Sequence, residues 1–141
     1  MGKSFKTTEE MYEVFGKLLG LGQHDDVIGK KLAKANITIR FKYTDPEGAI
    51  FIDLKSPPEE GHFNYSLGDY DTKSQITFTQ SADFSNRFWQ GKENPLLAIP
   101  ARKIKAEGNF PLALKLLPAI RPLFRAYKKM LKDIGREDLI A

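Results

Sequence analysis

A change of hydrophobic period at Ile37 constrains the fold of this chain more than any other feature. From 37 to 43, isoleucine, phenylalanine and tyrosine alternate with polar residues, which is the pattern of a strand with one buried face. Asp45-Pro46-Glu47-Gly48 follows, with proline and glycine where a type I turn favours them. The alternation then resumes over 50–54, so this segment predicts an antiparallel hairpin.

Three more strands are expected from the same alternation, over 63–67, 76–79 and 103–107. The turn sequence Gly68–Ser74 and two prolines at 57 and 58 separate them, because proline cannot donate to a strand ladder. These strands and the hairpin predict one five-stranded sheet, largely antiparallel or mixed.

Helical spacing of apolar residues marks the remaining segments. Thr7 and Glu10 fit a capping box that opens a first helix, which Gly20 and Gly22 are expected to end. A second helix is expected to start at Asp25 or Asp26 and to end near Asn36. Further helices are expected over 82–90 after the N-cap Ser81, from Asn94-Pro95, over 110–117, and over about 119–135 from near Pro118.

Together these elements predict an α/β (α+β) fold, with the sheet covered on one face by helices. The 141 residues contain no internal repeat, low-complexity segment or linker, so we expect a single domain over 1–141. The N-terminal segment carries acids where a signal peptide has an apolar run, and the last residues do not form a Ser-Lys-Leu address. We therefore expect a cytoplasmic protein.

Residues suited to catalysis or metal binding are sparse. His24 and His62 lie far apart without metal-ligand spacing, and the chain has no cysteine. The acidic pairs at 25–26 and 59–60 are better explained as a helix start and a solvated loop, and the glycines lack phosphate-loop spacing. We therefore expect no enzyme, no metal and no cofactor, although scattered catalytic groups would leave no such pattern.

Short motifs in order over about residues 25–117 resemble the sterol carrier protein type of lipid-binding domain. They are Gly48–Lys55, Ile76–Thr79, Ser81–Phe84, Gly91-Lys92, Asn94-Pro95, Lys103–Asn109 and Leu112–Leu116. Arg102 departs from the family pattern, which usually has glycine before the Lys-apolar-Lys strand. Pro118 and Pro122 depart from it by interrupting the C-terminal helix.

The resemblance implies an α/β fold with an apolar tunnel between sheet and helices. It also implies non-covalent binding of a sterol, fatty acid, fatty acyl thioester or phospholipid, as storage or transfer. The residues alone leave open whether the aromatics at 84–89 line a cavity or fill a core. With the resemblance, we expect an apolar lipid to contact Ile52, Phe78, Phe84, Phe88, Trp89, Leu96, Leu97, Ile99, Leu116, Leu117, Ile120 and Phe124.

Positive charge is concentrated at the C-terminal end. Residues 1–100 hold 12 basic and 14 acidic side chains (net −2), whereas residues 101–141 hold 10 basic and 4 acidic ones (net +6). At about 100° per residue, six of these cations share one arc of the last helix. They are Arg121, Arg125, Lys128, Lys129, Lys132 and Arg136.

This basic arc predicts contact with an anionic membrane surface, and its alternative is a solvated helix face. A nucleic-acid binder that uses the basic helix is a further alternative, but nucleic acid is not the expected partner, because no exposed aromatics interleave with the cations and no recognition motif is present. An interaction domain with the same fold and a filled core is the other alternative. The sequence leaves both a monomer and a homodimer open.

Overall fold

The computed structural model describes residues 4–141, and its core is a five-stranded mixed sheet in the order β3-β2-β1-β4-β5. The strands are β1 (Thr38–Thr44), β2 (Gly48–Asp53), β3 (Asn64–Leu67), β4 (Ile76–Ser81) and β5 (Ile104–Gly108). β1 lies at the centre, antiparallel to β2 and parallel to β4, and the other neighbouring pairs are antiparallel. The sheet expected from the sequence is therefore confirmed.

The β1–β2 hairpin has the register that the alternation predicts. Tyr43 pairs with Gly48 and Thr38 with Asp53, and the alternate residues from Ile37 to Tyr43 are buried. The turn differs from the expected type I, because the Asp45–Pro46 peptide bond is cis and Asp45 has a φ of 54°.

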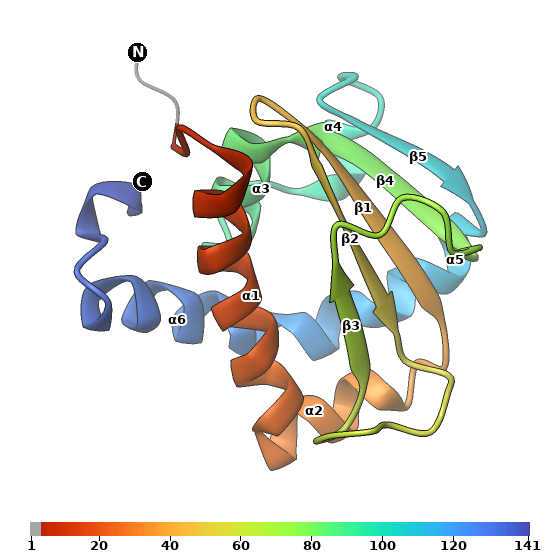
Figure 1. The fold of residues 1–141 in the computed structure, drawn as a ribbon. Helices are drawn as coiled ribbons and strands as arrows, with labels where there is room; N and C mark the ends of the chain where they lie inside the picture. Colours follow the sequence, from red (N-terminus) through yellow and green to blue (C-terminus); the bar gives the residue numbers. More distant parts are fainter. Residues whose placement is uncertain (1–3) are drawn as a thin grey trace.

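Six α-helices and two short 3₁₀ turns complete the described chain. They are α1 (Thr8–His24), α2 (Asp26–Ala33), α3 (Ala82–Phe88), α4 (Pro95–Ala98), α5 (Phe110–Ala113), η1 (Leu114–Leu116), α6 (Leu117–Asp133) and η2 (Glu137–Leu139). Figure 1 shows α1, α2, α3 and α6 on one side of the sheet, with α6 crossing beneath α1. The strands therefore present one face to the helices, as expected.

Side-chain caps fix the start of α1. The Thr7 hydroxyl accepts a hydrogen bond from the Glu10 amide (3.1 Å), while the Glu10 carboxylate accepts one from the Lys6 amide (2.7 Å). The expected end at Gly20 and Gly22 is wrong, since α1 continues to His24. Gly22 is buried, and a Cβ there would lie in ordinary contact, at 3.4 Å, with the Leu123 side chain of α6.

On the other face of the sheet, the outward-facing Arg40 is a buried cation. Arg40 of β1 is only 6% exposed because the loop between β3 and β4 covers it. Its guanidinium donates to the carbonyl oxygens of Asp69 and Thr72 and lies 3.6 Å from the Asp69 carboxylate. It also stacks over the Phe51 ring, 5.5 Å from the ring centroid. This network satisfies a charge that would otherwise be costly to bury.

The residues near the two ends of β5 include two with positive φ angles, Arg102 and Gly108. Arg102 adopts a φ of 62°, in the left-handed region that glycine occupies most easily. Position 102 therefore holds a non-glycine residue in a conformation that glycine adopts at lower cost. Gly108 has a φ of 108°, and a Cβ there would overlap the carbonyl oxygen of Gln75.

Candidate ligand-binding site

An apolar cavity of about 80 Å³ lies between the inner face of the sheet and the helices. Its walls come from every strand except β3 and from all six helices. The lining residues are Leu19, Leu32, Ile39, Phe41, Ile52, Leu54, Phe63, Phe78, Gln80, Phe88, Trp89, Pro95, Ile104, Phe110, Ala113, Leu114, Leu116, Leu117, Ile120 and Leu123. None of them is ionisable, so the cavity carries no charge of its own.

Strand register and ring packing position the aromatic part of the wall. Phe41 and Phe78 are register partners on β1 and β4, and their ring centroids lie 5.7 Å apart. Trp89 follows directly after α3 and meets Phe41 edge to face at 6.2 Å and Phe88 at 5.1 Å. Phe110, at the start of α5, meets Phe78 at 6.4 Å. These rings form a continuous aromatic part of the wall, contributed by the sheet and by α3 and α5.

Seven of the twelve residues expected to contact a lipid lie on this wall. They are Ile52, Phe78, Phe88, Trp89, Leu116, Leu117 and Ile120. They come from β2, β4, the end of α3 and the η1–α6 segment, so the predicted convergence of these elements on one space is present in the fold.

The other five residues lie away from the cavity wall. Phe84 is buried elsewhere, and Phe124 packs edge to face on Phe88 at 5.8 Å. Leu96 and Leu97 are 52% and 70% exposed, while Ile99 is half-buried against the core. The physical reason is that α4 is a single turn, which buries Ala98 and turns Pro95, instead of its leucines, toward the cavity.

Other lining residues were missed at the sequence level, and some of them had a usable signal. Ile39 and Phe41 alternate on the inner face of β1, and the same alternation along β4 continues from Ile76 and Phe78 to Gln80. Leu19 and Leu32 lie on α1 and α2, and their place on the wall follows only from how these helices pack.

Helix α6 is divided between the cavity and a buried polar network. Its first half supplies Leu117, Ile120 and Leu123 to the wall. In its second half, the Tyr127 hydroxyl donates to Asn86 Oδ1 (2.7 Å), and Asn86 Nδ2 donates to the Leu139 carbonyl (2.9 Å). Burial raises the pKa of Tyr127, so this hydroxyl stays protonated. The network fixes the second half of α6 to α3 and to the C-terminal segment.

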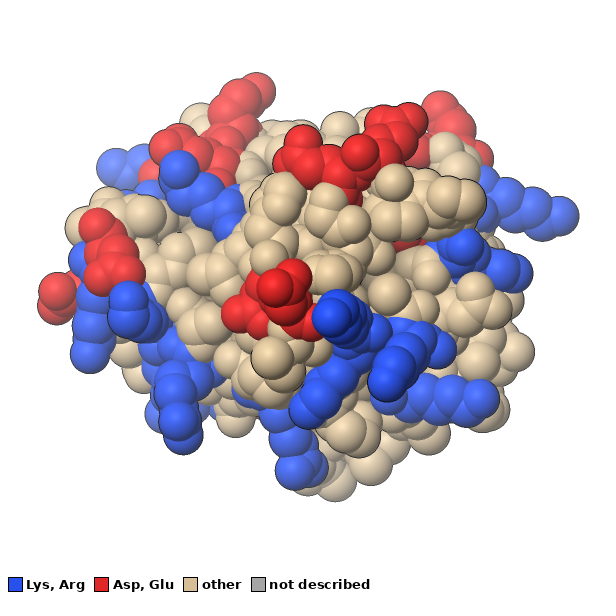
Figure 2. Space-filling model, turned by 90° about the horizontal axis from the view of Figure 1, so that it is seen from below, with Lys and Arg blue, Asp and Glu red and all other residues tan. Residues whose placement is uncertain are grey.

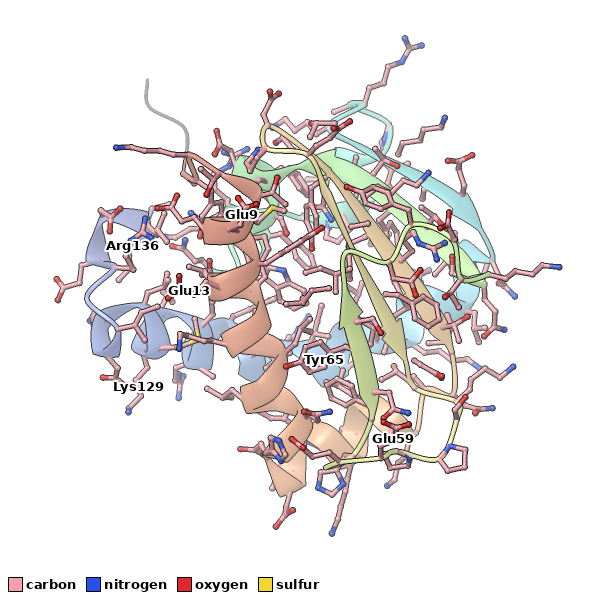
Figure 3. The ribbon with its side chains drawn as sticks, viewed as in Figure 1. Glu9, Glu13, Glu59, Tyr65, Lys129 and Arg136 are labelled. Carbon is pink, nitrogen blue, oxygen red and sulfur yellow. The ribbon has the colours of Figure 1, made fainter. Side chains whose placement is uncertain are left out.

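The buried and basic sides of α6 face opposite directions. Arg121, Arg125, Lys129 and Lys132 are exposed, and Lys128 is half-buried. Lys129 points away from the helix and lies 3.2 Å from the Asp133 carboxylate (Figure 3). Figure 2 views the molecule from below, and most of the charged side chains in the lower half of that picture are Lys and Arg.

Arg136 does not belong to this solvent-facing group. It lies past the end of α6, where Figure 3 shows it beside α1. Its guanidinium donates to Glu10 (3.3 Å) and to both carboxylate oxygens of Asp138 (3.1 Å each). Its role in the fold is to join the C-terminal segment to α1. The neighbouring α2, which packs against α6, adds exposed lysines at 30, 31 and 34.

Comparison with known families decides the identity of this fold. The model of the SCP-2 sterol transfer family matches residues 15–121. The chain belongs to this family. No curated protein sequence matches it.

Solved structures of SCP-2 proteins share the architecture. Sterol carrier protein 2 from Yarrowia lipolytica, in its apo form, has a TM-score of 0.60 and 19% identity over 81% of this chain and 89% of its own. Sterol carrier protein domain 2 of Helicoverpa armigera has a TM-score of 0.56 and 28% identity over 80% and 89%. A sec-alkylsulfatase from Pseudomonas sp. has a TM-score of 0.53 and 17% identity over 70% of this chain and 14% of the enzyme. The SCP-2 fold thus also occurs as a small part of a larger enzyme.

Within residues 4–141, no three His, Asp or Glu side chains gather in a way that would hold a metal ion. Over the same residues, no helix combines the length and the apolar character needed to cross a bilayer.

Proposed function

We propose that this SCP-2 protein binds an apolar lipid in the cavity between sheet and helices and transfers it, without catalysing a reaction on it. The observation that carries the proposal is an apolar, uncharged cavity wall in a family named for sterol transfer. Burial of about ten methylene groups would contribute roughly 8 kcal/mol at about 0.8 kcal/mol each. This sum corresponds to a Kd of about 1 μM before the costs of association and of ordering the lipid, which weaken the net affinity.

The size of the cavity requires that it expand to admit a lipid. A ligand pocket usually measures about 300–1,000 Å³, whereas this cavity measures about 80 Å³. The wall formed by α5, η1 and the first half of α6 is the best candidate to move, since its elements are short and interrupted by Pro118 and Pro122. The polar network around Tyr127 holds the second half in place. We infer that the first half of α6 swings away while the second half stays docked.

The exposed cations of α6 supply a means of reaching a membrane. Arg121, Arg125, Lys128 and Lys132 lie within about 60° around the helix, on the side opposite the cavity residue Leu123. An anionic bilayer attracts each of them by up to about 1 kcal/mol. Docking through this face would place the movable wall next to the bilayer, where a lipid enters or leaves.

Lipid binding is tested on protein that has been stripped of copurified lipid. Mass spectrometry of the extract identifies what was bound, and titration with fatty acids, alcohols and sterols then follows the emission of Trp89, the chain's single tryptophan. We expect an emission shift with a Kd below about 100 μM, equivalent to about −5.5 kcal/mol. Unchanged emission, no copurified lipid and no binding by equilibrium dialysis would refute the proposed function.

A further inference from the structure

One polar side chain stands in the apolar wall of the cavity. Gln80 occupies an inward position on β4, between its register partners Tyr43 and Ile104. The side chain lines the cavity and is only 4% exposed. Its carboxamide oxygen has no hydrogen-bond partner among residues 4–141.

An unpaired buried acceptor at this place needs an explanation. Proteins pair the great majority of their buried polar groups, because an unpaired group has given up its hydrogen bonds to water. The alternating residues before it on the same strand face, Ile76 and Phe78, are apolar, so a third apolar residue would have satisfied the packing. Gln80 therefore costs stability in the empty protein, and a group entering the cavity would recover that cost.

We propose that Gln80 binds the hydroxyl group of a neutral lipid, such as a long-chain alcohol or a sterol-like alcohol. This inference rests on the proposed function and names the class of ligand for the same cavity. The carboxamide oxygen accepts the hydroxyl proton, and the carboxamide NH₂ can donate to the hydroxyl oxygen. A hydroxyl group matches both ends of the side chain.

A carboxylate ligand fits this wall less well. It has no proton for the unpaired oxygen, and no lining residue carries a positive charge to compensate its own. An alkyl chain without a hydroxyl group leaves Gln80 as it is in the empty protein. The geometry therefore ranks the three ligands as alcohol, then apolar chain, then carboxylate.

The test compares three ligands with the same tail: 1-dodecanol, 1-chlorododecane and dodecanoate, each titrated against Trp89 emission and by native mass spectrometry. We expect dodecanol to bind the parent protein about tenfold more tightly than chlorododecane, which corresponds to about 1.4 kcal/mol. Gln80→Met keeps the length and shape of the side chain. It should weaken dodecanol binding about tenfold and leave chlorododecane unchanged, so that their affinity ratio falls to about one.

The melting temperature of Gln80→Met provides a second readout, since removing the unpaired acceptor should leave it equal to or above that of the parent. Equal binding of dodecanol and chlorododecane by the parent would overturn the role of Gln80 and leave the lipid-binding function standing. So would tightest binding of dodecanoate with no effect of Gln80→Met. Failure of all three ligands to bind below about 100 μM would remove the proposed function, and this inference with it.

Discussion

Filling the cavity should make the protein more stable and a poorer lipid binder at the same time. Ala113, at the end of α5, lines the cavity and is 6% exposed, so Ala113→Leu adds three carbon atoms to the empty space. At about 24 cal/mol per Å³, a cavity of about 80 Å³ destabilises the fold by roughly 2 kcal/mol. Three buried carbons at about 0.8 kcal/mol each give a similar figure of about 2.4 kcal/mol.

The lost rotamer freedom of leucine, about 0.5–1 kcal/mol, reduces the expected net gain to roughly 1–1.5 kcal/mol. For a domain of this size, that raises Tm by roughly 4–6 °C. A lipid must now displace the leucine, so its affinity should fall at least about tenfold, or about 1.4 kcal/mol. Calorimetry and the Trp89 titration measure the two effects on the same sample.

The matched control is Ala82→Leu, at a residue of α3 that is fully buried but does not line the cavity. Overpacking there should destabilise the protein by about 1–3 kcal/mol and leave lipid affinity unchanged below the transition. If Ala113→Leu also lowered Tm, or if it left lipid affinity intact, the cavity would not be an expandable binding site and the reasoning would be wrong.

Two further predictions concern α6. Lys128→Glu with Lys132→Glu should weaken binding to anionic vesicles, measured by co-sedimentation, by roughly 2–4 kcal/mol at low salt. The same double variant should leave Tm nearly unchanged. About 0.5 M salt should mimic the effect for the parent. The same exchange at Lys42 and Lys55, which are exposed elsewhere, is the charge-matched control, and equal loss in both variants would contradict a specific docking face. Tyr127→Phe removes a 2.7 Å buried hydrogen bond and should lower Tm by roughly 4–8 °C; an unchanged Tm would show that the network does not fix α6.

The sheet could be predicted from the sequence because each strand carries its own local signal. Alternation from Ile37 and the turn at 45–48 define the hairpin without reference to the rest of the chain. The parallel pairing of β1 with β4 had no such signal, since it depends on how distant segments meet. The end of α1 was misplaced for a related reason: Gly22 looks like a helix terminator in sequence, but it is a buried residue inside α1 that faces Leu123 of α6.

The cavity wall was predicted less completely, because periodicity identifies an inner face without saying what that face meets. Leu96 and Leu97 have the apolar character of wall residues, yet α4 is too short to turn them inward. Gln80 was passed over because a polar residue was not expected on an apolar wall, although its position in the strand alternation points inward. Arg40 shows the converse: its outward position was predictable, but the loop that covers it was not.

The parallel pairing of β1 with β4 has a consequence for the order in which the chain folds. Thr38 and Gln75, which bond at the start of these strands, lie 37 residues apart, whereas a tight turn joins β1 to β2. Closing the longer loop costs about 2 kcal/mol more chain entropy, which favours the hairpin as the earlier event. The segment from Phe110, which supplies the last wall, is synthesised after all five strands. A nascent chain that has completed its five strands therefore still lacks the wall formed by α5, η1 and α6, and the cavity is open on that side until the C-terminal segment emerges.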